Sequence, residues 1–167
     1  MNWLFLTVFY SGLVPKAPGT AGTIVALPLG VLILAYFGPQ TLFMAALFLT
    51  LAGIKAVNNY QKTSDTHDDS RIVIDELVGM WFALSIAPGI FTPLGELLSL
   101  ENGMLIQIVL SFLFFRYFDI KKPSIIGRID REAPGGYGVM FDDVVAGVSA
   151  GILTAIVWQG ILASGIY

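Results

Sequence analysis

The chain has 167 residues, of which 56% are hydrophobic and only 13% are charged. A soluble domain carries about 25% charged residues, so much of this chain is expected to face lipid rather than water. The net charge of −3 and the scattered basic residues do not form a nucleic-acid footprint. The absence of cysteine excludes disulfides, cysteine nucleophiles and thiolate metal sites. The length suits a single domain, residues 1–167.

The N-terminal segment, MNWLFLTVFYSGLVPK, has no basic residue before its apolar run. A cleavable signal peptide would need one, so we expect this segment to be retained. It is too short to span a bilayer. We expect it to lie in the membrane interface or to begin the helical bundle.

Five apolar segments follow, at residues 23–38, 41–54, 77–94, 104–115 and 144–166. A full membrane span takes about 20 residues, so the last segment fits well, and shorter ones can cross if flanking side chains snorkel or the bilayer thins. Pro28 and the pair Pro88-Gly89 should bend or interrupt their helices. The stretch FGPQT predicts a tight turn that makes a hairpin of the first two segments. The sequence therefore predicts an all-α, multi-helix membrane bundle with about five apolar helices.

The charged residues separate sharply if all five segments cross the membrane. One side then holds the entry to the first segment and residues 55–75 and 116–143, with all nine Lys and Arg residues. The other side holds no basic residue, only Glu96 and Glu101. The positive-inside rule makes the basic side cytoplasmic. The sequence thus predicts a multi-pass protein with its polar site at the cytoplasmic ends of the helices.

Two acidic pairs, Asp75-Glu76 and Asp142-Asp143, each stand just before a long apolar segment. Acidic residues suit a helix N-terminus, where a carboxylate can cap free N–H groups, so capping alone could explain one pair. For two pairs on the same face, capping is less convincing, because one carboxylate suffices and a second costs desolvation. The alternative is a hard-cation site, since Mg²⁺ prefers carboxylate oxygens, waters and substrate phosphate.

Basic residues accompany the acidic pairs. In FRYFDIKKP, Arg116 and Lys122 flank Asp119 in a way that fits a clamp on phosphate oxygens, whereas Lys121 is equally well explained as a lipid-headgroup anchor. Lys16, in PKAPGTAGT, precedes a glycine- and threonine-rich turn into a helix. Such a turn can present N–H groups to an anion, although the glycines could instead serve close helix packing.

The single histidine, His67, excludes mechanisms that need two histidines, such as that of the type-2 lipid phosphate phosphatases. A DxDx[ST] nucleophile motif and a Walker A loop are also absent from the sequence. Carboxylate and metal chemistry, with Lys and Arg neutralising charge, is what remains.

Four separated stretches resemble the phosphatidylglycerophosphatase A family: PKAPGTAGT, HDDSRIVIDELVGMW, FRYFDIKKP and GGYGVMFDDVVAG. They come in the order of the family and cover most of the chain between residues 15 and 151. The resemblance implies a Mg²⁺-dependent hydrolase that converts phosphatidylglycerophosphate to phosphatidylglycerol and phosphate, in a helical fold of the bacterial cytoplasmic membrane. The polar positions that match the family are Lys16, Thr20, Asp68, Asp75, Glu76, Arg116, Asp119, Lys122, Asp142 and Asp143.

The residue types suggest a division of roles. We expect a Mg²⁺ site formed by the two acidic pairs, Asp75-Glu76 and Asp142-Asp143. The expected phosphate-binding residues are Thr20, Lys16, Arg116 and Lys122, the last three also stabilising charge during the reaction. Asp119 and Asp68 are the candidates for the carboxylate that activates water or attacks directly.

Two other classes of function stay open from the sequence. A small membrane transporter would need charges inside its helices, whereas the acids here cluster at one end. A non-catalytic protein could use the basic loops simply to hold anionic lipid headgroups.

Overall fold

The computed structural model describes residues 3–64, 69–87 and 103–165. Helices hold 83% of these residues, and no strand occurs among them, which confirms the all-α prediction. The elements in chain order are α1 (Trp3–Leu6), the 3₁₀-helix η1 (Ser11–Leu13), α2 (Pro18–Gln61), α3 (Ile74–Ile86), α4 (Met104–Lys121), α5 (Ile125–Glu132) and α6 (Gly135–Ala163).

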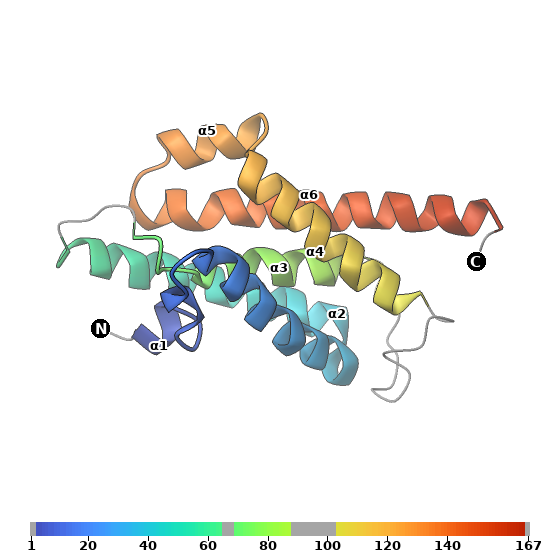
Figure 1. Cartoon of the computed structure of the whole chain (residues 1–167), viewed down its shortest axis with the longest axis horizontal. Helices are drawn as coiled ribbons and strands as arrows, with labels where there is room; N and C mark the ends of the chain where they lie inside the picture. Colours follow the sequence, from blue (N-terminus) through green and yellow to red (C-terminus); the bar gives the residue numbers. More distant parts are fainter. Residues whose placement is uncertain (1–2, 65–68, 88–102, 166–167) are drawn as a thin grey trace.

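The predicted hairpin is present within α2, whose two halves run in opposite directions (Figure 1). The reversal occurs at Gly38, where φ is 81° and ψ is 171°, and Pro39 follows it. Glycine permits this positive φ because it has no Cβ. Of the bend or interruption expected at Pro28, there is no interruption, since Gly38 is the one non-helical residue inside α2. The expected break at Pro88-Gly89 lies outside the described residues.

Two of the described helices, α2 and α6, are long and apolar enough to cross a membrane. The helix α3 has only 13 residues, and α4 has 18 and carries three charged residues, Arg116, Asp119 and Lys121. Large apolar side chains are exposed along both long helices, including Phe37 and Phe48 on α2 and Ile156 on α6. Such surfaces suit contact with lipid tails.

The short helix α3 forms the centre of the bundle and packs mainly against α2 and α6. Nearly all of its side chains are buried. Its backbone meets that of α6 closely, because a Cβ on Gly147 would lie 2.1 Å from the carbonyl oxygen of Gly79. In lipid, the hydrophobic effect does not drive helices together, and their association depends on van der Waals packing. Small residues permit the close backbone contact that such packing needs.

The last helix begins at Gly135, nine residues before the apolar segment that the sequence analysis marked. Asp142 and Asp143 therefore lie inside α6 and do not stand at its start, so the expectation that they precede the helix is wrong, and neither caps its N-terminus. The sequence analysis did not place the helix start at GGYG, because glycine has a low helix propensity. At Gly136 packing overrides propensity, because a Cβ there would lie 2.5 Å from the carbonyl oxygen of Ile54.

The predicted polar stretches lie toward one end of the bundle. The start of α6, the end of α2 and the whole of α5 lie at the left in Figure 1, and the kink of α2, the start of α4 and the end of α6 lie at the right. The helix α5 falls inside a stretch that the sequence analysis treated only as a charged connection.

The N-terminal segment begins the bundle, one of the two places expected for it. Leu6 and Val8 are almost fully buried, and the carbonyl oxygen of Leu6 accepts a hydrogen bond of 2.9 Å from the backbone N–H of Val73. The segment thereby lies against the connection that leads into α3.

The close contact of α3 and α6 predicts different outcomes for two glycines of the same helix. Gly147→Ala should lower the free energy of unfolding by about 1–3 kcal/mol, because the new Cβ forces the backbones apart. Gly160→Ala should raise it by up to about 1 kcal/mol, because alanine has the higher helix propensity. Apart from the adjacent residues and the nearby helix backbone, no atom of the described residues lies within 4 Å of the added carbon. Unfolding followed by circular dichroism in detergent micelles measures both, and equal effects would contradict the close packing.

Candidate active site

A polar cavity of about 400 Å³ lies between the start of α2, the start of α3, the end of α4 and the first third of α6. Side chains from four helices and from the connection before α3 reach it. Its charged and hydroxyl-bearing lining residues are Thr20, Asp69, Ser70, Asp75, Glu76, Arg116, Asp119, Lys122, Asp142 and Asp143. The structure describes nine of the ten predicted site residues, and all of these except Lys16 line the cavity: Thr20, Asp75, Glu76, Arg116, Asp119, Lys122, Asp142 and Asp143.

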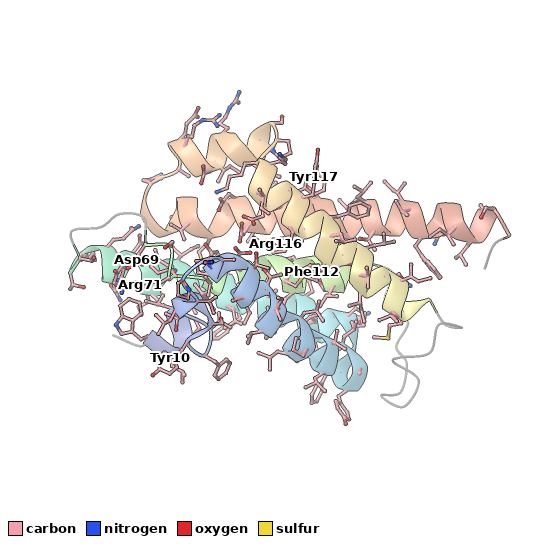
Figure 2. All side chains as sticks on the ribbon, viewed as in Figure 1. Tyr10, Asp69, Arg71, Phe112, Arg116 and Tyr117 are labelled. Carbon is pink, nitrogen blue, oxygen red and sulfur yellow. The ribbon has the colours of Figure 1, made fainter. Side chains whose placement is uncertain are left out.

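Arg116 of α4, labelled in Figure 2, lines this cavity and links α4 to side chains of α2 and α3. Its Nη1 atom lies 2.5 Å from Oε2 of Glu76 and 2.7 Å from Oδ2 of Asp119. All three side chains are largely buried, with relative exposures of 10–14%. Because charges with little access to water are costly unless they are paired, this cluster holds the helix ends in a fixed arrangement.

Two threonines of α2 complete the surroundings of Arg116. The Nη2 group donates a hydrogen bond of 3.2 Å to the hydroxyl of Thr20, and Thr23 donates one of 2.9 Å to Oε2 of Glu76. Thr23 is a site residue that the sequence analysis missed. Its position one helical turn after Thr20 was the available signal, because residues three apart share a helix face.

The glycine in this turn serves close packing. A Cβ on Gly19 would lie 2.0 Å from Oε1 of Glu76, so only glycine lets the start of α2 approach that carboxylate so closely. Of the two readings of PKAPGTAGT, the structure favours packing at this position. Lys16 is exposed before α2 begins and does not line the cavity.

Three carboxyl groups converge in the cavity in a way that suits a cation. Oxygen atoms of Glu76, Asp119 and Asp143 all lie within 4.8 Å of one another. These residues come from α3, α4 and α6, so the tertiary fold creates the group and no local sequence pattern encodes it. Asp75 and Asp142, the other two expected metal ligands, line the same cavity beside this trio. We refer to Glu76, Asp119 and Asp143 as the acidic trio.

Lys122, the residue that ends α4, reaches the cavity from an unusual backbone conformation. Its φ of 44° and ψ of 54° are left-handed, which is rare for a residue with a side chain. Its Nζ atom lies 2.7 Å from Oδ2 of Asp142 and 2.5 Å from Oδ1 of Asp130 on α5. Burial disfavours the charge of Lys122, but the two hydrogen-bonded carboxylates outweigh it and raise the pKa of this ammonium above its ordinary value. The neighbouring Lys121 is exposed and lies outside the cavity.

The Oδ1 atom of Asp142 is buried and, within the described part of the chain, has no hydrogen-bond partner. Buried polar atoms are nearly always satisfied, so an atom of this kind calls for an explanation such as a bound ion or water. Asp75 has a different environment, since its Oδ1 atom accepts a hydrogen bond of 2.9 Å from the backbone N–H of Glu76 in the first turn of α3.

Asp69, which the sequence analysis did not select, lines the cavity from the connection before α3, and we call this part of the lining its rim. Arg71 donates two hydrogen bonds to it, of 2.8 and 2.6 Å, and the Tyr60 hydroxyl donates a further one. The Arg71 guanidinium holds the pKa of the Asp69 carboxyl well below its usual range. Asp68, a predicted catalytic residue, lies outside the described residues.

Comparisons with known proteins agree with the motifs. The model of the protein family described as Phosphatidylglycerophosphatase A matches residues 4–158. Phosphatidylglycerophosphatase A of Escherichia coli is 36% identical over 154 residues, covering 90% of this chain and 81% of the relative. The protein of the same name from Haemophilus influenzae is 33% identical over 145 residues, covering 87% and 81%. A Bacteroides thetaiotaomicron protein named "Putative phosphatidylinositol-3-phosphatase" is 37% identical over 155 residues, covering 90% and 89%. No solved structure matches the chain significantly.

The Arg116 cluster makes a prediction about stability. Arg116→Met should lower the free energy of unfolding by about 3–5 kcal/mol, because Glu76 and Asp119 are left buried without their cation. The double variant Arg116→Met/Glu76→Gln should recover part of this loss, since one of the two unpaired carboxylates is removed. Unfolding in detergent micelles measures the free energy for the wild type, the two single variants and the double variant.

The matched control is Arg71→Met, which removes a pair on the exposed surface and should cost much less. A double variant as unstable as the sum of its two single variants would contradict the pairing.

Proposed function

This chain belongs to the phosphatidylglycerophosphatase A family, and we propose that it hydrolyses phosphatidylglycerophosphate to phosphatidylglycerol and phosphate at the polar cavity. The observation that carries the proposal is the meeting of phosphate-binding and metal-binding side chains in one cavity beside membrane-length helices. A phosphomonoester on a lipid headgroup needs the charged cavity and the apolar helices, because its charge must be neutralised while the acyl chains stay in an apolar surrounding.

The charge balance of the cavity favours a metal cofactor. Among the described residues, six carboxyl groups and two basic side chains line it, so a phosphate dianion would be repelled unless cations enter with it. Carboxylate oxygens are the donors that Mg²⁺ prefers, and the partnerless Oδ1 atom of Asp142 fits a cavity built to receive a cation or its bound water. We propose that the acidic trio would hold Mg²⁺, with Asp75 and Asp142 contributing to the negative wall around it.

The basic side chains have separate positions around the substrate. When bound, Mg²⁺ would neutralise charge on the phosphate oxygens. In our proposal Arg116 and Lys122 donate hydrogen bonds to those oxygens, and the hydroxyl of Thr20 orients the group. Lys16, exposed at the approach to α2, would attract the headgroup from the membrane surface.

The reaction itself breaks the bond between phosphorus and the glycerol oxygen. A water molecule attacks phosphorus while a carboxylate accepts a proton from it, and the carboxylate then returns that proton to the departing glycerol oxygen. Of the two candidates, Asp119 belongs to the acidic trio and would be engaged as a ligand. This arrangement favours Asp68, or one of the wall residues Asp75 and Asp142, as the proton acceptor.

We further propose that the protein crosses the bacterial cytoplasmic membrane several times with this cavity on the cytoplasmic side. The nine basic residues on one side of the five-segment arrangement support this orientation. The two halves of α2 and the helix α6 would then supply three of the five crossings.

The proposal is tested by phosphate release from purified protein in mixed micelles. We expect hydrolysis of phosphatidylglycerophosphate that stops with a chelator and returns with Mg²⁺, and weaker hydrolysis of phosphatidic acid. Phosphatidylinositol 3-phosphate forms the third arm, because of the name of the Bacteroides relative. Absence of phosphate release from all three lipids would favour a transporter or a lipid-binding protein.

Substitution of two adjacent lysines distinguishes phosphate binding from attraction to the membrane surface. Lys122→Ala should lower kcat by tenfold or more, a loss of about 1.4 kcal/mol in transition-state stabilisation, because its ammonium reaches the cavity. Lys121→Ala should leave kcat nearly unchanged, since this residue is exposed outside the cavity. Steady-state kinetics in micelles of fixed composition measure both. Equal effects confined to KM, and reduced by salt, would make the stretch a membrane anchor.

A further inference from the structure

A second cavity, of about 530 Å³, lies between the N-terminal segment, both halves of α2 and α3. All eleven side chains that line it are apolar. The one polar atom among them, Nε1 of Trp81, donates a hydrogen bond of 2.9 Å to the carbonyl oxygen of Ala26 and is therefore already satisfied. The cavity, which we call the apolar groove, can bind an apolar ligand, but the side chains described around it offer no partner to a polar one.

The apolar groove and the polar cavity share the first turn of α3. Ile74 and Leu77 line the groove, whereas Asp75 and Glu76 line the polar cavity. Successive residues of a helix point in directions about 100° apart, so the two sites lie on different faces of the same turn. A ligand that fills both must join a phosphate to an apolar chain across about the diameter of one helix, roughly 10 Å. A phospholipid has this construction.

The outer wall of the groove is held in a strained conformation. Val8, Phe9 and Tyr10 have φ values of 45°, 55° and 66°, a left-handed run that residues with side chains rarely adopt. Val8 and Phe9 line the groove, and Tyr10 points away from the bundle in Figure 2. Strained backbone persists only where the surrounding structure fixes it, and it is common at ligand sites.

The same wall is tied to the rim of the polar cavity. The hydrogen bond between Val73 and Leu6 joins the N-terminal segment to the connection before α3. The guanidinium of Arg71 lies 4.9 Å from the ring centroid of Trp3 and also pairs with Asp69 at the rim. An acyl chain in the groove and a headgroup in the cavity would therefore contact one connected unit.

We infer that the apolar groove binds one acyl chain of the same lipid whose phosphate enters the polar cavity, an inference that rests on the proposed function. Leu4, Phe9 and Leu32 at its edge are exposed, which leaves the groove open to the side for a chain that enters from the bilayer. Since lipid tails are as apolar as the groove, its benefit is orientation: a chain fixed along α2 places the headgroup against the acidic trio.

The experiment compares two substrates with the same headgroup, one with long and one with short acyl chains. Leu32→Trp narrows the groove, and Leu47→Trp is the matched control, because Leu47 lies on the same helix, is 42% exposed against 43% for Leu32, and does not line the groove. Phosphate release is measured from dioleoyl and dihexanoyl phosphatidylglycerophosphate in micelles of one detergent. Leu32→Trp should lower kcat/KM for the dioleoyl lipid about tenfold more than for the dihexanoyl lipid, through loss of orientation. Leu47→Trp should keep the wild-type ratio.

A second measurement separates this inference from the proposed function. A phosphatidylglycerophosphate with a photoactivatable acyl chain should crosslink to Val8, Phe9 or Leu32 of the unmodified protein, located by mass spectrometry, whether or not the lipid is hydrolysed. Crosslinks without turnover would overturn the proposed function and leave the groove intact. The inference about the groove would be overturned if Leu32→Trp kept the wild-type ratio of kcat/KM between the two lipids. Crosslinks confined to other surfaces would overturn it as well. If Leu32→Trp alone changes the oligomeric state, as seen by light scattering, the apolar groove would be a contact surface for a second copy of the chain. That result would also overturn the inference.

Discussion

The pairing of Arg116 with Glu76 and Asp119 is the interaction on which the rest of the site depends. It joins α4 to α3 at hydrogen-bonding distance, and the threonines of α2 add a third helix. The guanidinium is suited to this position because its planar fork can serve several acceptors at once and it stays charged when buried. Without it, carboxylates from three helices would be forced together in a region poor in water, and their repulsion would separate the helix ends.

Arg116 does not neutralise all the carboxyl groups around it. One guanidinium serves Glu76 and Asp119, whereas Asp143 joins the same acidic trio from α6. The cavity therefore holds more negative charge than its own cations balance, and in a low dielectric such an excess is resolved by protonation or by a bound cation. A protein that only stabilised its fold would gain nothing from this surplus. In a phosphatase, a site that draws in a cation before or with the phosphate uses it directly.

The sequence predicted the chemistry of the site better than its geometry. The hairpin at FGPQT and the all-helical fold followed from turn chemistry and hydropathy. Charge and the family resemblance marked most polar residues of the cavity, but not Asp69 or Ser70. The membership of the acidic trio did not follow from the sequence, because Glu76, Asp119 and Asp143 meet only through tertiary packing. The start of α6 was placed too late, since glycines that read as a loop are required where the backbone of α6 meets neighbouring chain segments. Asp130 could not be selected either, as its contact with Lys122 depends on where α5 folds back.

The position of α3 accounts for the relation between these features. At 13 residues it is short for a lipid-facing helix, and its burial between α2 and α6 removes the need for it to meet lipid along its length. Its first turn then has two protected faces, one polar and one apolar. A headgroup phosphate and an acyl chain differ most in what they require of their surroundings, and they are separated in the lipid by only a short glycerol unit. A single buried helical turn can satisfy both at that separation, which two independent helices could do only if their relative position were fixed by further contacts.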